Sequence, residues 1–201
     1  MKISCTTAFT PNKKTSETLV IPCYLDKKPA KNYQLAKTGI ATIDKYIGTL
    51  LSHKEFTGKS QEMLYCFVDG TIPQSILLIG LGEAKSVTAE DLRETGALIT
   101  KKLRQLKKTA LVITNLLLSD EHTVNLVEGV SLANYQTDMF KTSKSRPALL
   151  ASMIVVTASK NKTLLPQLNR ILTLSKHIHQ VRDLINMPAD NIYPESLAQH
   201  A

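Results

Sequence analysis

The sequence predicts an α/β domain in which a mixed β-sheet is flanked by helices and followed by one long C-terminal helix. Strand-like apolar segments alternate with helical patterns from residue 62 onward, an order typical of a sheet covered by helices. After residue 162, apolar residues hold one helical face up to Ile185. The 201 residues are 43% hydrophobic and 21% charged, which excludes a disordered or fibrous chain and supplies a core without disulfide or metal.

The first third of the chain predicts two strands, a loop and a helix. Residues 3–9 and 18–24 are short apolar segments, and the second is apolar enough to be buried on both faces. The polar segment 27–31 contains a proline and predicts a loop. Isoleucines and leucines at helical spacing then predict a helix over residues 38–52.

The next two strands are predicted over residues 62–68 and 75–80, with a turn at Asp69-Gly70 between them. Because the second of these segments is strongly apolar, we expect this pair to form the centre of the sheet.

The clearest single helix is predicted from Thr88 to Lys107. Asp91 stands three residues after Thr88, as in a capping box, and basic residues gather at the far end, which is the charge order that a helix dipole favours. Three further elements complete the predicted domain: a strand over 110–116, a helix over 124–135 and a strand over 149–157.

The last predicted elements form a tail. The long helix ends at Asn186-Met187-Pro188, and Pro194 and Glu195 then occupy the first turn of another helix. Because natural chains rarely end inside a newly started element, we expect the sequence to be a piece of a longer protein.

Composition predicts a cytoplasmic protein. Lys and Arg exceed Asp and Glu by 25 − 17, a net charge of +8 that attracts acidic partners without selecting one. The three cysteines, Cys5, Cys23 and Cys66, are widely spaced and odd in number, which favours reduced thiols. Neither a signal peptide nor an apolar run long enough for a membrane span is present in the sequence.

Gly80-Leu81-Gly82 is a candidate phosphate loop because glycines let backbone amides approach an anion. The third glycine of a dinucleotide motif and the Gly-Lys-Ser/Thr of a P-loop are both missing, and Glu83 would repel phosphate. A tight turn is the preferred interpretation.

The sequence offers no catalytic or metal-ligating residue. His177 and His179 are two apart on a helix, where side chains diverge, so a solvated helix face is preferred over a metal site. The other histidines are His53, His122 and His200. No serine or cysteine stands in a nucleophile motif.

Four pairs of adjacent lysines leave nucleic-acid binding open as an alternative, because sequence-independent binding needs only clustered positive charge. Solvated lysines remain the preferred interpretation because aromatic residues and arginines are scarce around them. The pairs are Lys13-Lys14, Lys27-Lys28, Lys101-Lys102 and Lys107-Lys108.

Three phrases stand in order along the chain: residues 77–83 with 88–96, Glu128-Gly129-Val130 with Tyr135, Asp138 and Lys141, and residues 182–190 with 194–198. In order and spacing they resemble the N-terminal portion of the leucyl (cytosol) aminopeptidase family of metallopeptidases. The third is the most specific, and Met187 stands in it where the family commonly has Thr.

The resemblance implies a macro-domain-like α/β domain over residues 1–160, a linker helix over 161–188 and the start of a C-terminal peptidase domain over 189–201. It also implies two divalent metal ions, Zn or Mn, in that peptidase domain and a hexamer of the full-length protein. The family's Gly-Lys-Gly and Asp-Ser-Gly-Gly catalytic segments are absent from this sequence, so no catalytic, cofactor-binding or metal-binding residue is assigned.

Three functions follow as hypotheses. The preferred one is an accessory domain of an aminopeptidase that serves assembly or substrate access. A nucleic-acid-binding or nucleotide-binding module is the alternative, and a stand-alone enzyme is the weakest, because no nucleophile or metal constellation is present in the sequence.

Overall fold

A computed structural model describes residues 1–7, 17–25, 33–34, 38, 41–52, 56–68, 75–137, 148–157 and 162–200. The strands in these ranges are β1 (Lys2–Thr6), β2 (Glu17–Leu25), β3 (Tyr33–Gln34), β4 (Met63–Phe67), β5 (Ser75–Glu83), β6 (Ala110–Thr114) and β7 (Ser152–Val156). The helices are α1 (Ala41–Ser52), α2 (Ala89–Gln105), α3 (Asp120–Ala133), α4 (Leu164–Ile185) and α5 (Pro194–His200). The predicted loop at 27–31 and the predicted turn at 69–70 lie outside the described ranges.

The strands form one mixed sheet in the order β1-β7-β6-β2-β5-β4, and β3 pairs with the end of β2. Neighbouring strands are parallel except in the β4–β5 and β2–β3 pairs, which are antiparallel. The prediction that β4 and β5 form the centre of the sheet was wrong, because β2 and β6 lie there and β4 lies at an edge. The edge position fits β4, in which Met63 to Cys66 are only partly buried and Phe67 is exposed, whereas every residue of β6 is buried.

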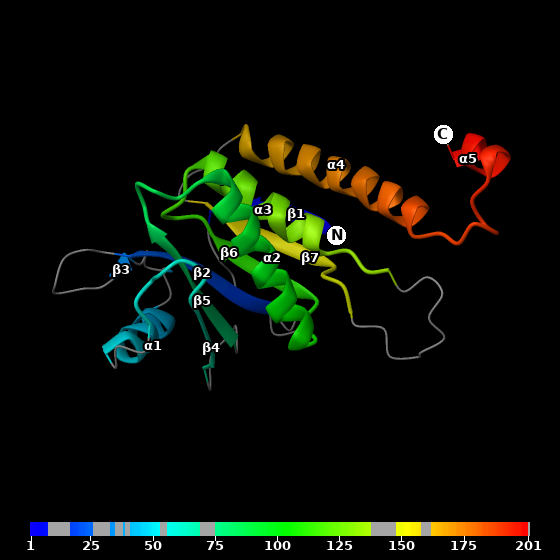
Figure 1. Cartoon of the computed structure of the whole chain (residues 1–201). Coiled ribbons are helices and arrows are strands. Elements are labelled where there is room, and N and C mark those ends of the chain that lie inside the picture. The colour runs from blue at the N-terminus through cyan, green and yellow to red at the C-terminus, as the bar shows by residue number, and fades with distance from the viewer. Residues whose placement is uncertain are drawn as a thin grey trace.

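Helices cover both faces of the sheet, which confirms the predicted α/β class (Figure 1). Alternate residues of β2 point to opposite faces, so Val20 joins one core cluster and Leu19 and Ile21 join the other. The first cluster includes buried side chains of α2, α3 and α4, and the second includes those of α1. The core therefore has two layers of side chains, one on each face of the sheet.

Helices α2 and α3 approach each other so closely that only glycine fits at their crossing. A Cβ atom on Gly96 would lie 2.2 Å from the Leu126 carbonyl oxygen, and one on Gly129 would lie 2.0 Å from the Arg93 carbonyl oxygen. The Arg93 side chain also reaches Glu128, with 2.6 Å between Nε and Oε2. The predicted capping box of α2 is present, since the Thr88 hydroxyl accepts from the Asp91 amide and the Asp91 carboxylate accepts from the Thr88 amide.

The long C-terminal helix is confirmed as α4, and its two halves differ in burial. Leu164 and Leu168 are fully buried in the core, whereas Val181 and Ile185 near the end of the helix are exposed. Figure 1 shows α4 running across α3 and carrying α5 away from the sheet. The second half of α4 therefore presents apolar side chains that this domain leaves uncovered.

Candidate functional site

The Gly80-Leu81-Gly82 segment lies inside strand β5, so the predicted tight turn was wrong. A Cβ on Gly80 would lie 2.0 Å from the Lys59 carbonyl oxygen. Gly82 has a φ of +76° and donates its amide to the Gly58 carbonyl at 3.0 Å. Both glycines let the backbone of residues 58–62 lie against the strand, which explains them without a phosphate.

The two histidines of α4 occupy different surroundings. His177 is exposed, with Nδ1 2.9 Å from Gln180 Oε1. His179 is half-buried against α3, with Nε2 3.4 Å from the Leu132 carbonyl oxygen and its ring 5.1 Å from the ring of Tyr135. Burial lowers the pKa of His179. The predicted solvated face was therefore right for His177 and wrong for His179.

The carboxyl end of the sheet, where open α/β folds commonly bind ligands, brings together Tyr24 and His122. The Tyr24 hydroxyl lies 3.1 Å from His122 Nδ1. Asn115 at the end of β6 is buried, and its Oδ1 has no hydrogen-bond partner among the described residues. The segments that follow β1, β2 and β7 are outside the described ranges, as are the side chains of His53 and His200, so this edge supports no assignment.

Cysteines and acidic residues do not gather into a metal centre in the described part of the chain. No group of three His, Cys, Asp or Glu side chains there could hold a metal ion. Cys5, Cys23 and Cys66 are free thiols. Burial raises the pKa of Cys66 to about 11 and raises that of Cys23 as well, so these two thiols are poor nucleophiles.

The described basic pairs lie near the end of α2 and do not point to one groove. Lys101 is exposed on the helix, whereas the Lys108 ammonium lies 6.0 Å from the centre of the Phe67 ring at the edge strand β4. The Lys13-Lys14 and Lys27-Lys28 pairs, like Asp138 and Lys141, are outside the described ranges.

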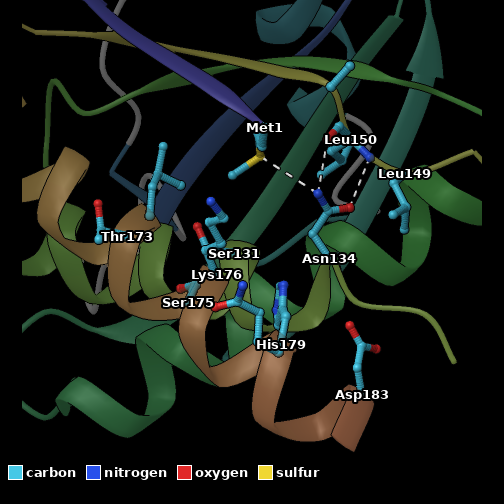
Figure 2. A pocket seen from close by; sticks show the side chains of 13 residues that line it. Met1, Ser131, Asn134, Leu149, Leu150, Thr173, Ser175, Lys176, His179 and Asp183 are labelled. Atoms are coloured by element: carbon cyan, nitrogen blue, oxygen red, sulfur yellow. Dashed lines mark hydrogen bonds between the residues drawn. The ribbon is translucent and has the colours of Figure 1, made fainter. Parts of the chain in front are cut away.

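A groove of about 630 Å³ lies between α4, the end of α3 and the residues that precede β1 and β7 (Figure 2). Asn134 builds one wall because its side chain makes two hydrogen bonds with the backbone of Leu150, both 2.9 Å long. Asp183 stands on the α4 wall and accepts a 2.8 Å hydrogen bond from the Tyr135 hydroxyl. Sequence reasoning missed this groove, although the spacing of Lys176, His179 and Asp183 on one helix face was readable.

Comparison with known proteins decides the family. The family model described as "Cytosol aminopeptidase family, N-terminal domain" matches residues 20–144, more than half of the chain. The chain belongs to the cytosol aminopeptidase family. The predicted resemblance is thereby confirmed.

Two curated relatives in the cytosol aminopeptidase family show the extent of the match. A protein of Protochlamydia amoebophila named "Probable cytosol aminopeptidase" is 27% identical over 94% of this chain and 38% of its own length. "Probable cytosol aminopeptidase 1" of Shewanella oneidensis is 28% identical over 96% of this chain and 37% of its own length. The chain therefore spans less than half the length of these family members.

Solved structures confirm the fold of the cytosol aminopeptidase N-terminal domain. A tomato leucine aminopeptidase mutant aligns with 99% of this chain and 41% of its own chain, at a TM-score of 0.74 and 17% identity. The bottromycin maturation enzyme BotP in complex with Mn aligns with 92% of this chain and 35% of its own, at a TM-score of 0.65 and 18% identity. Within the described residues, no helix is long and apolar enough to cross a membrane.

Proposed function

We propose that this chain is the non-catalytic N-terminal domain of a cytoplasmic, metal-dependent aminopeptidase that releases N-terminal amino acids from peptides. Two findings support this proposal: a family model for the N-terminal domain matches the chain, and the chain covers only 38% of the length of a curated relative. Residues 1–160 form the domain, 161–188 link it to the peptidase domain and 189–201 begin that domain. The role proposed for it is either assembly or control of substrate access, and the full-length protein is proposed to be a hexamer.

The two metal ions proposed for the full-length enzyme, Zn or Mn, belong to the peptidase domain. The described residues of this chain do not fit a metal, because they contain no group of three candidate ligand side chains. No catalytic or cofactor-binding residue is therefore proposed in this chain.

An exposed apolar stripe on α4 supports attachment to a further domain. Its residues are spaced four, three and four apart, so they lie along one side of the helix, and they are between 41% and 75% exposed. The stripe consists of Leu174, Ile178, Val181 and Ile185. We propose that the peptidase domain covers it, because contiguous exposed apolar surface of this kind marks an interaction site.

Aminopeptidase activity tests the proposal directly. The purified 201-residue chain should release no leucine from leucine p-nitroanilide with Zn or Mn, whereas the product of the reading frame extended beyond Ala201 should do so. Metal-dependent hydrolysis by the short chain would contradict the proposal, as would an inactive extended protein that is folded and metal-loaded.

The apolar stripe is tested by Ile185→Asp in both proteins. Ile185 is 75% exposed in this chain, so the substitution should leave the melting temperature of the short chain unchanged and lower that of the extended protein. Gln167→Asp, on an exposed position of the same helix, is the matched control and should change neither. Equal effects of Ile185→Asp in both proteins would show that the stripe is not covered by the peptidase domain.

The net charge of +8 supports nucleic-acid binding as the second candidate. Retention on DNA or heparin that falls steeply with salt would support it. If the chain elutes from DNA or heparin at low salt and the extended protein is active, nucleic-acid binding would be rejected and the aminopeptidase proposal retained.

A further inference from the structure

The groove between α4 and the end of α3 has the size of a ligand site and a mixed lining. Its volume of about 630 Å³ lies within the range of roughly 300–1,000 Å³ that is common for small-ligand pockets. Leu149, Leu150 and Leu172 provide an apolar part of the wall. Side chains of α4, among them Thr173, Lys176 and Asp183, provide most of the polar part (Figure 2).

Two of the lining side chains carry opposite full charges: Lys176 near the middle of the α4 wall and Asp183 at its C-terminal end. They are seven residues apart, which corresponds to roughly 10 Å along a helix. Among the described residues neither forms an ion pair, and the hydrogen bond from Tyr135 holds the Asp183 carboxylate in position. The α4 wall therefore carries one cationic and one anionic side chain that the described residues do not pair with an opposite charge.

The side chains between these charges offer hydrogen bonds of both kinds. His179 donates from Nε2 to the Leu132 carbonyl, which leaves Nδ1 as an acceptor on the neutral ring. Gln180 Oε1 pairs with His177, so its amide Nε2 remains as a donor. A peptide backbone presents a donor and an acceptor at each residue, and these two side chains match them.

We propose that this groove binds a short peptide with free ends, whose ammonium group lies at Asp183 and whose carboxylate lies at Lys176. Three extended residues span roughly 10 Å, which matches the spacing of the two residues along the helix axis. A single amino acid is too short to reach both charges. A phosphate ligand would be repelled by Asp183. The inference rests on the groove alone and does not depend on the proposed peptidase parent.

The test is an NMR titration of the purified chain with trialanine and with trialanine blocked at one end or the other. Trialanine should shift backbone amides of residues 176–183 and of Asn134 at concentrations near 1 mM, the range expected for a few solvent-accessible contacts. Blocking either end should weaken binding about fivefold, the effect of losing one accessible charge pair. Equal binding of free and doubly blocked peptide, shifts confined to other surfaces or no shift at about 10 mM would overturn the proposal.

Variants assign each end of the peptide. In Lys176→Ala, trialanine and its C-terminal amide should bind equally, while the preference for a free amino end remains. In Asp183→Asn, which keeps an acceptor for Tyr135, the preference for a free amino end should disappear. Lys101→Ala, an exposed lysine of α2, is the matched control and should bind as the unchanged chain does. The assigned orientation would be contradicted if a single variant lost both the preference for a free amino end and the preference for a free carboxyl end. It would also be contradicted if both variants kept both preferences.

Discussion

Gly129→Ala is the sharpest test of the packing between α2 and α3. The new Cβ would lie 2.0 Å from the Arg93 carbonyl oxygen and 2.6 Å from the Arg93 carbonyl carbon. Both neighbours are backbone atoms and cannot rotate away, so the two helices must separate. Gly48 on α1 is the matched control because a Cβ there meets no atom within 4 Å.

The magnitude follows from two opposing effects. Replacing a helix glycine by alanine stabilises a helix by about 0.5–1 kcal/mol, because the unfolded chain loses conformational freedom. Overpacking against backbone costs about 3 kcal/mol at the upper end of its usual range, so Gly129→Ala should lower the free energy of unfolding by about 2 kcal/mol. Gly48→Ala should raise it by about 0.5–1 kcal/mol.

Urea unfolding followed by circular dichroism at 222 nm measures the free energy of unfolding of both variants. The dependence of that free energy on urea concentration should be the same in all three chains if unfolding is two-state. In a thermal scan, Gly129→Ala should melt about 4–8 °C lower than the unchanged chain. A Gly129→Ala chain as stable as the unchanged one would refute the close approach of the helices, and equal destabilisation by Gly48→Ala would show that contact is not the cause.

Three further predictions concern the cap, a histidine and a thiol. Thr88→Ala should lower the melting temperature by about 2–4 °C, because the hydroxyl that accepts from the Asp91 amide is lost, and Thr88→Ser should restore it. The pKa of His179, measured by NMR, should lie below the ordinary histidine value of 6.5. Because the folded state favours the neutral ring, its contribution to the free energy of unfolding should be present above pH 6.5 and should decline as the pH falls, and His179→Gln should remove this decline. Cys66, with a pKa of about 11, should react slowly with a thiol reagent at pH 7 in the native chain and quickly in guanidinium, and rapid native reaction would contradict its burial.

Local signals in the sequence were sufficient for most of the helices and strands. Helix α2 could be placed from Thr88, Asp91 and the charge order, because a cap and a dipole involve residues within one turn. Helix α4 could be placed from its apolar repeat and the proline at 188. The predicted helix over 124–135 instead runs from Asp120 to Ala133, because Ser119 caps it through the His122 amide.

The order of the strands and the candidate groove could not be predicted from local signals. Both β2 and β5 read as buried strands, and only pairing between segments far apart in the chain places β2 at the centre of the sheet and β4 at its edge. Gly80 read as a turn glycine because nothing nearby in sequence shows that residues 58–62 fold against it.

The sequence by itself determined the family, the α/β class and the long helix that carries Lys176, His179 and Asp183, because each depends on residues that are near one another in the chain. Only the tertiary structure decided that this face forms a groove. The opposite wall comes from Asn134 and Leu150, which are joined by a pair of hydrogen bonds. Both lie more than 20 residues before Lys176 in the sequence. Such a contact forms when elements pack, and its partners are chosen by the shape of the whole core rather than by neighbouring residues.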